Sequence, residues 1–282
     1  MALLGIPRAY LGLDIGTTNI KLVELLDRGK RHELSTYAYA PRTRSIKTGA
    51  IISRMLEAAQ TSADDLIISL PNKAIFCVKL TLPDLPEDEL AAAVKFKARE
   101  VVPLSLDDVE LAWYKQPDGV YLVATAKTVI AQYRRLAERL GLKLVGTEAE
   151  IFSLMRTHTI NTGQNTIFCN IGGQETTLHL IKHGFPCSSS TIPGGSQSID
   201  SLFQEVEHIA AGLRVTKTIL VGGGINLASF KNRWIKQFGH QPSISNPWQS
   251  LSFQEGLEGK LVNLGPLLAV AVGLARSKLS VL

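Results

Sequence analysis

The sequence lacks several features that identify the structural or functional class of a protein of this size. There are three cysteines among 282 residues, Cys77, Cys169 and Cys187, and no CxxC pair occurs. An odd number without that spacing indicates reduced thiols in a cytosolic compartment. No GxxxxGK[ST] segment is present, which excludes a P-loop nucleotide site. The composition, 45% hydrophobic and 20% charged, is that of an ordinary globular protein.

Long apolar segments are also missing. The longest, Leu264–Ala275, is about half as long as a helix that crosses a bilayer. The apolar start, Met1–Gly5, is too short for the core of a signal peptide and is soon followed by Arg8. We therefore expect any association with a membrane to occur through a partner or a surface.

The excess of charge of one sign is small. A net charge of +5, spread along the chain, does not by itself indicate nucleic acid as a partner. The most basic stretch contains one acid, Glu33, and is either a solvated face or a surface held against anionic lipid or an acidic partner. Its basic residues are Arg28, Lys30, Arg31, Arg42, Arg44, Lys47 and Arg54.

Periodic patterns predict alternating strands and helices. Period-two alternation predicts strands at 10–26 (two strands around a glycine turn), 33–40, 66–70, 74–82, 109–115, 120–126, 142–150, 165–171, 176–182, 187–192 and 216–221. Helical spacing with start and stop signals predicts helices at 46–60, 86–103, 129–140, 151–157, 198–211, 226–238 and 264–279. The mixture indicates an α/β fold.

The two halves of the chain begin with similar segments, Asp14–Leu22 and Asn170–Leu178. Each has a strand that delivers an acid or amide, then a glycine turn, then hydroxyl residues, and the offset of 156 residues holds without gaps. Glycine lets backbone N–H groups approach an anion closely, and a carboxylate at a strand end can hold a hydrated Mg²⁺. The repeat predicts two hairpins, one from each lobe, that clasp a triphosphate.

A third glycine segment follows the second hairpin. The strand Ile219–Val221 runs into Gly222, Gly223 and Gly224 before a helix, which brings the backbone close to a flat ligand or an α-phosphate. The order of hairpin, long insertion, hairpin, triple glycine and closing apolar helix resembles that of the actin, Hsp70 and sugar-kinase superfamily. The resemblance implies a two-lobed actin-like (ribonuclease H-like) α/β fold.

The insertion between the hairpins resembles a particular family, the PilM-type proteins of type IV pilus assembly. The similar segments are 68–71, 80–85, 89–90, 100–109, 122–127 and 133–143, with further similarity at 219–224 and 265–275. The resemblance implies a first lobe over 1–145, with a small inserted α+β subdomain at about 70–126. It implies a second lobe over 146–282, whose closing helix 264–279 packs back toward the first lobe.

One part of the second lobe is expected to be reduced. About 23 residues separate Pro193–Gly195 from Ile219, where the family has a long helical stretch that helps to form the adenine pocket.

The same resemblance implies a cytoplasmic scaffold, peripheral to the inner membrane, that binds ATP with Mg²⁺. Its expected partner is the cytoplasmic tail of a PilN-type pilus protein, held in a groove bounded by the Leu80–Pro103 region and the first lobe. Leu82, Leu85 and Phe96 are either contacts for this tail or core residues. Motor or platform proteins of the pilus are further expected partners, nucleic acid is not, and the membrane is reached through a partner.

The nucleotide site implied by the resemblance comprises the residues of both hairpin turns and the triple glycine, with Asp14 also holding Mg²⁺ through water. These residues are Asp14, Gly16, Thr17, Thr18, Asn19, Lys21, Asn170, Gly172, Gly173, Gly222, Gly223 and Gly224. Two orientations of Lys21 stay open, toward a phosphate or outward from its strand.

Position 170 departs from the superfamily, which usually has aspartate there. The Asn170 amide makes hydrogen bonds but cannot act as a base or bring charge to a metal, so at most a weak ATPase is expected. Glu148 and Glu150 lie where some members place a catalytic or water-orienting acid, and a structural role is the alternative. His179 and His183 lack an evident third ligand for a metal.

Three functions remain open at this point. The first is an assembly scaffold, favoured by the insertion and by Asn170. The second is a small-molecule kinase, whose base would have to be Asp14, Glu148 or Glu150. The third is a filament former like FtsA, although the tail Leu274–Leu282 is too short and too weakly charged for a clear membrane-binding helix.

Overall fold

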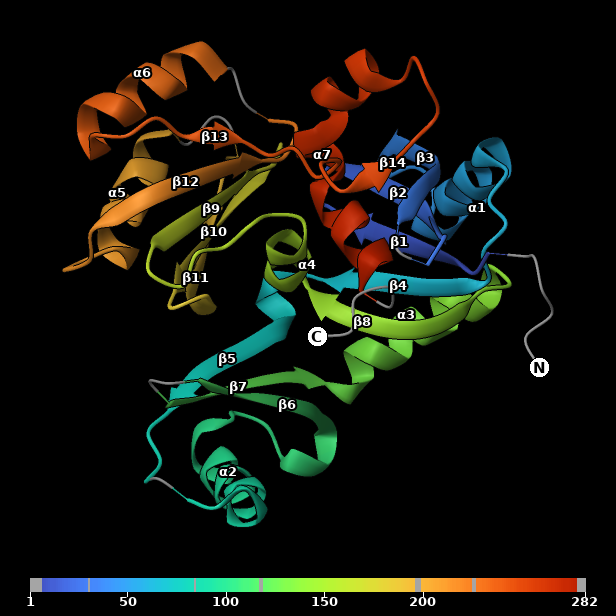
Figure 1. The fold of residues 1–282 in the computed structure, drawn as a ribbon. Helices are drawn as coiled ribbons and strands as arrows, with labels where there is room; N and C mark the ends of the chain where they lie inside the picture. Colours follow the sequence, from blue (N-terminus) through green and yellow to red (C-terminus); the bar gives the residue numbers. More distant parts are fainter. Residues whose placement is uncertain are drawn as a thin grey trace.

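The structure is a computed structural model that describes residues 7–29, 31–83, 85–116, 119–195, 199–224 and 227–277. Two larger sheets form two lobes, and a three-stranded sheet projects from the first lobe (Figure 1). The C-terminal helix α7 lies between the two larger sheets.

The first sheet is organised around a hairpin. Its strand order is β14-β3-β2-β1-β4-β8, with β1 antiparallel to β2 and parallel to β4. Apolar side chains alternate to both faces because both faces are covered by helices. The strands are β1 (Ala9–Ile15), β2 (Asn19–Asp27), β3 (His32–Pro41), β4 (Asp65–Leu70), β8 (Lys143–Ala149) and β14 (Leu251–Ser252).

The three-stranded sheet has the order β5-β7-β6 and is antiparallel throughout. The helix α2 packs on one face, where Leu90, Val94 and Ala98 meet Leu122 and Ala124. This unit follows β4 and η1 (Asn72–Ala74) and returns to the first lobe through α3. Its elements are β5 (Ile75–Leu80), α2 (Glu87–Val101), η2 (Leu106–Asp108), β6 (Val109–Gln116) and β7 (Gly119–Ala126). We call it the inserted subdomain.

The second sheet has the order β11-β10-β9-β12-β13 and repeats the arrangement of the first, with a hairpin next to a parallel strand. Its elements are β9 (Asn165–Ile171), β10 (Glu175–Lys182), β11 (Phe185–Pro193), α5 (Ile199–Ile209), β12 (Val215–Val221), α6 (Leu227–Phe238) and β13 (Ser243–Ile244).

Each large sheet has its own pair of outer helices. On the first sheet they are α1 (Thr48–Ala59) and α3 (Lys127–Arg139), and on the second they are α5 and α6. The inner faces share α4 (Glu150–Arg156) and α7 (Glu258–Arg276). One hydrophobic cluster there joins Tyr10 and Ile67 of the first sheet to Phe168 and Ile219 of the second. The two lobes therefore share one buried core.

The closing helix differs from its prediction. It begins at Glu258, whereas the predicted start was Leu264, because polar residues in the first turns hide the helical pattern there. Residues 278–279 of the predicted helix lie outside the described part of the chain. Its length and composition would suit a membrane span, but ten of its residues are buried between the lobes. That packing is typical of a core helix.

Two short strands were not predicted, since two residues carry no periodic pattern. The first, β13, extends the second sheet beside β12. The second, β14, pairs with β3, so the chain returns to the first sheet before α7 begins. The expected helix cap Asn226 lies outside the described residues.

Two glycines allow α7 to approach its neighbours at backbone distance. A Cβ atom on Gly12 of β1 would lie 2.1 Å from the Ala271 carbonyl oxygen, and one on Gly273 would lie 2.0 Å from the Ser153 carbonyl oxygen of α4. Real Cβ atoms do not approach oxygen so closely, so any side chain there forces the elements apart.

We predict that Gly273→Ala lowers the free energy of unfolding by about 3 kcal/mol, because overpacking displaces α4 or α7. Gly259→Ala is the matched control on the same helix, since a Cβ there would meet nothing within 4 Å. It should change stability by less than about 1 kcal/mol. Urea unfolding followed by circular dichroism measures both, and equal effects would contradict the proposed close packing.

Candidate functional site

The two hairpin turns have the same local geometry. In the β1–β2 turn the Gly16 amide donates to the Asn19 carbonyl oxygen at 3.0 Å, and in the β9–β10 turn the Gly172 amide donates to the Glu175 carbonyl oxygen at 2.9 Å. The sequence repeat is therefore also a structural repeat, with one copy in each sheet.

The two turns face each other and touch. A Cβ atom on Gly173 would lie 2.6 Å from the Thr18 methyl carbon. The glycine backbone of the second turn thus lies directly against Thr18 of the first turn. A ligand can bind between the two turns only if they move apart. We call this region the cleft.

Glycines also surround the second turn. A Cβ on Gly195 or Gly224 would lie 2.4 or 2.5 Å from the Gly172 carbonyl oxygen. A Cβ on Gly222 would lie 2.2 Å from the Ile171 carbonyl oxygen, and the φ of Gly222 is +91°. The triple glycine therefore lies beside the second hairpin turn, where bare backbone is required.

Two amides of the triple glycine are already used within the protein. The Gly222 amide donates to the Pro266 carbonyl oxygen of α7 at 2.8 Å, and the Gly224 amide donates to the Ile171 carbonyl oxygen at 3.0 Å. These bonds hold the loop to the core.

Asp14 and Lys21 form an ion pair beside the first turn. They are register partners on β1 and β2, and Lys21 Nζ lies 2.8 Å from Asp14 Oδ2. Their side chains are 11% (Asp14) and 14% (Lys21) exposed, so the pair is largely withdrawn from water. Lys21 thus points toward the cleft carboxylate rather than outward from its strand.

A second polar group is centred on Glu150, the first residue of α4. Its Oε2 accepts from Asn170 Nδ2 at 3.0 Å, and its Oε1 lies 2.7 Å from His179 Nε2. His179 Nδ1 in turn lies 2.7 Å from Ser189 Oγ. Burial by itself raises the pKa of Glu150, but His179, the Asn170 amide and the Lys21 charge together hold that pKa below its usual value.

Glu148 takes part in a separate ion pair. Arg156 lies 3.0 Å from Glu148 Oε1 and also donates to the Gly273 carbonyl oxygen at 2.8 Å. Ser153 Oγ donates to the same carboxylate at 3.2 Å. Glu148 therefore joins β8 to α4 and α7, which supports its structural interpretation.

No metal cluster of three or more His, Cys, Asp or Glu side chains occurs within the described residues. His179 is engaged by Glu150 and Ser189, and His183 lies in the β10–β11 turn with a φ of +53°.

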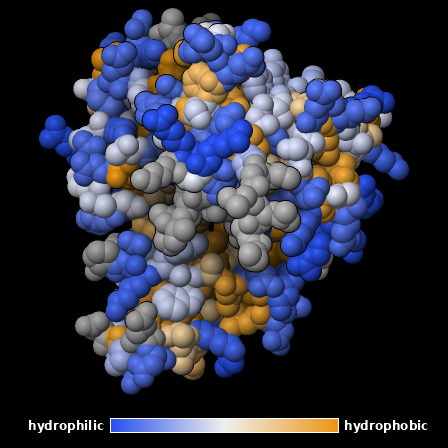
Figure 2. All heavy atoms as spheres, turned by 45° about the vertical axis from the view of Figure 1, so that its right-hand side comes forward, coloured by the Kyte–Doolittle hydropathy of each residue, from blue (hydrophilic) through white to orange (hydrophobic). Residues whose placement is uncertain are grey.

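A groove separates the inserted subdomain from the first lobe. One hollow of about 160 Å³ is lined by residues of β6 and β7, among them Ala112, Tyr114, Val123 and Thr125, and by residues of β8 and α4. A second hollow of about 220 Å³ continues past Val123 and Phe152 to β11. Figure 2 shows apolar side chains gathered on the lower part of the molecule, which the inserted subdomain forms.

These hollows lie elsewhere on the inserted subdomain than the Leu80–Pro103 region, which was expected to bound the groove for the partner tail. The groove follows the face of the three-stranded sheet opposite α2, so most of the Leu80–Pro103 region lies behind the sheet. Leu82 packs in the inserted core, whereas Phe96 is 64% exposed on α2. Sequence alone did not reveal which face of the inserted sheet meets the first lobe.

Aromatic rings close the end of the groove and connect the inserted subdomain to the second lobe. The Tyr114 ring lies 5.4 Å from the Phe152 ring and 5.3 Å from the Phe185 ring, and Tyr121 lies 4.6 Å from Phe185. Asn72 Nδ2 donates to Thr191 Oγ1 at 3.0 Å across the same boundary. The three units therefore meet at one seam.

We predict that Asn170→Asp destabilises the protein by about 2 kcal/mol near neutral pH, because a second carboxylate would face Glu150. The repulsion raises the folded-state pKa of this carboxyl pair above the unfolded value. The penalty is therefore largest above that raised pKa and shrinks as the pH falls and one carboxyl becomes protonated.

Urea unfolding at about pH 8 and about pH 5 tests this dependence. Asn165→Asp is the control on the same strand, where the amide is exposed and donates to the Arg214 carbonyl oxygen. A penalty for Asn170→Asp that does not decrease on acidification would contradict the assignment.

Comparisons with known proteins agree with this architecture. The family model "Type IV pilus assembly protein PilM" matches residues 12–205. A solved structure titled "PilM-PilN type IV pilus biogenesis complex" matches with a TM-score of 0.81 at 19% identity, covering 96% of this chain and 99% of that one.

Two more distant structures share the fold. The cytoplasmic domain of EpsL, an inner-membrane component of the type II secretion system of Vibrio cholerae, has a TM-score of 0.55 at 8% identity over 92% of this chain and 94% of its own. A Bacteroides thetaiotaomicron protein with an actin-like ATPase fold has a TM-score of 0.54 at 9% identity over 93% and 98%.

These similarities confirm the two-lobed actin-like α/β fold that the sequence predicted. The family model matches more than half of the chain, and this match shows that the chain is a member of that family. The chain belongs to the PilM family of type IV pilus assembly proteins.

Proposed function

We propose that this chain is a scaffold of the type IV pilus assembly platform that binds the cytoplasmic tail of a PilN-type protein in the groove beside its inserted subdomain. It acts on the cytoplasmic side of the inner membrane and is held there by that partner. ATP with Mg²⁺ binds in the cleft between the hairpin turns and sets the spacing of the lobes. Motor or platform proteins of the pilus are further partners.

The groove is the observation that carries the proposal. A solved complex of this family pairs PilM with PilN, and this chain aligns with it over nearly its whole length. The groove is lined by the apolar residues Ala112, Val123 and Phe152 and by the polar residues Glu110 and Thr147. An extended apolar tail with a few polar groups suits such a lining.

The cleft has the features expected for a nucleotide. The bare turns at Gly16, Gly172 and Gly222–Gly224 allow backbone to approach phosphates, and Lys21 brings a positive charge to the same place. Thr17, Thr18, Asn19 and Gly173 complete the facing turns. Asp14 Oδ1 is outside its ion pair with Lys21, so Asp14 fits the role of holding hydrated Mg²⁺, which would screen the phosphate charge.

The bonding partners of the three candidate catalytic acids favour a scaffold over a kinase. Asp14 is paired with Lys21, Glu148 with Arg156, and Glu150 with His179 and Asn170. Each acid that the kinase hypothesis required is therefore already bonded within the described residues. At most a slow ATPase follows from this arrangement.

We predict that Ala112→Asp weakens binding of a peptide with the sequence of the partner's cytoplasmic tail by about tenfold or more, because it places a charge among the apolar residues that line the groove. Phe96→Asp, on the far face of the inserted subdomain, should leave the affinity unchanged. Fluorescence anisotropy of a labelled tail peptide measures both. The reverse pattern would place the partner on α2.

Lys21→Gln should weaken MgATP binding by about tenfold, since one charge-assisted contact to phosphate is lost. Calorimetry with MgATP measures the effect, and Lys95→Gln on α2 is the charge-matched control. Unchanged affinity in Lys21→Gln would show that the nucleotide does not bind between these turns.

A further inference from the structure

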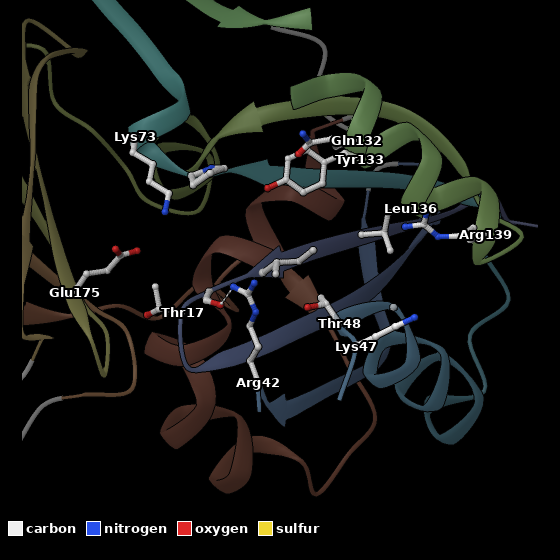
Figure 3. A pocket seen from close by; sticks show the side chains of 14 residues that line it. Thr17, Arg42, Lys47, Thr48, Lys73, Gln132, Tyr133, Leu136, Arg139 and Glu175 are labelled. Carbon is white, nitrogen blue, oxygen red and sulfur yellow. Dashed lines mark hydrogen bonds between the residues drawn. The ribbon is translucent and has the colours of Figure 1, made fainter. Parts of the chain in front are cut away.

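A separate hollow lies at the carboxyl ends of β1 and β4, outside the groove. Its volume is about 440 Å³, and it is bounded by the start of α1, by α3 and by the β9–β10 turn (Figure 3). A neighbouring hollow of about 460 Å³ shares Thr17, Arg42, Lys47 and Thr48 with it. Ligands of α/β proteins commonly bind at this edge of a sheet.

Cations from three parts of the chain, the β3–α1 connection, η1 and α3, line this hollow. Arg42, Lys47, Lys73 and Arg139 line it, and Arg44 lines the neighbouring one. Glu175, from the second lobe, is the one carboxylate among the described residues lining it. In Figure 3, Lys73 and Arg42 enter the space from opposite sides.

Glu175 is the only counter-charge beside these cations among the described residues that line the hollow. None of the five forms an ion pair with a carboxylate anywhere in the described part of the chain. Gathering like charges without partners is unfavourable, and a bound anion would relieve that repulsion. Three residues of the basic stretch, Arg42, Arg44 and Lys47, thus line these two hollows and are exposed to solvent.

Uncharged donors point to the same space. Thr48 and Gly49, in the first turn of α1, line the hollow, and this helix start has neither a side-chain cap nor an acid to balance its positive end. The Tyr133 hydroxyl also faces the hollow in Figure 3. Burial raises the pKa of Tyr133 although Arg42 opposes the shift, so the phenol keeps the proton that it can donate.

We infer that this hollow binds the phosphate group of a small phosphorylated ligand, at a site that adjoins the cleft and shares Gly16 and Thr17 with it. Arginine forks and lysine ammonium groups are the side chains that proteins use for phosphate oxygens, and the volume is within the usual range for small-molecule sites. The phosphate can come from a soluble metabolite or from a lipid headgroup. This inference does not rest on the proposed function.

Arg42 connects the site to the cleft. Its guanidinium donates to the Gly16 carbonyl oxygen of the first turn at 3.1 Å. A phosphate that draws on the same guanidinium would therefore act on the position of that turn.

Calorimetric titration with inorganic pyrophosphate tests the site. The double variant Lys47→Gln, Lys73→Gln should bind pyrophosphate about tenfold more weakly than the wild-type chain, because two charge-assisted contacts are lost. The double variant Lys95→Gln, Lys236→Gln removes the same charge from α2 and α6 and should bind normally. All four lysines are exposed, so both proteins should fold.

Location and source of the phosphate are tested separately. In crystals soaked with tungstate, an anomalous peak beside Lys47 and Lys73 supports the site, and a peak confined to the cleft overturns it.

Vesicles with phosphatidylglycerol that bind the wild-type chain but not the Lys47→Gln, Lys73→Gln variant identify a lipid source, whereas pyrophosphate binding without vesicle binding identifies a soluble one. Equal weakening in both double variants, or no binding of either probe, overturns the inference.

Discussion

Close backbone contact along α7 is the constraint on which the rest of the structure depends. At Gly12 the first sheet meets this helix, and at Gly273 the helix meets α4, in both cases at distances that exclude a side chain. The inner faces of both sheets rest on α4 and α7, so this spacing also sets the separation of the two hairpin turns. The Gly222 amide, bonded to the Pro266 carbonyl oxygen, ties the triple glycine to the same helix.

The acidic side chains of the cleft are bonded to other side chains of the same chain. Lys21 balances Asp14, and His179 and Asn170 bind Glu150, so both acids are bonded to side chains of the chain itself. The amide at position 170 is consistent with this arrangement, because it donates a hydrogen bond to Glu150 where an aspartate would repel it. Such a site favours binding and positioning over proton transfer.

One short helix, α4, links the cleft to the groove beside the inserted subdomain. α4 places Glu150 at the cleft and Phe152, two residues later, in the groove, where its ring packs with Tyr114 and Phe185. A ligand that separates the turns would have to move α4 or the sheets around it. The same movement would change the shape of the groove, because the aromatic seam joins all three units.

The sequence by itself determined most of the longer elements and the hairpin that opens each half. Local signals did this: alternation and a glycine turn predicted the β1–β2 hairpin, and the 156-residue repeat predicted its copy. Tertiary structure decided which faces met. It placed α2 behind the inserted sheet, turned Lys21 toward Asp14, and buried Glu24, whose carboxylate accepts hydrogen bonds from the Ser62 and Ala63 amides. Such contacts join residues far apart in the chain, and the free energy that selects them comes from packing, which no local pattern records.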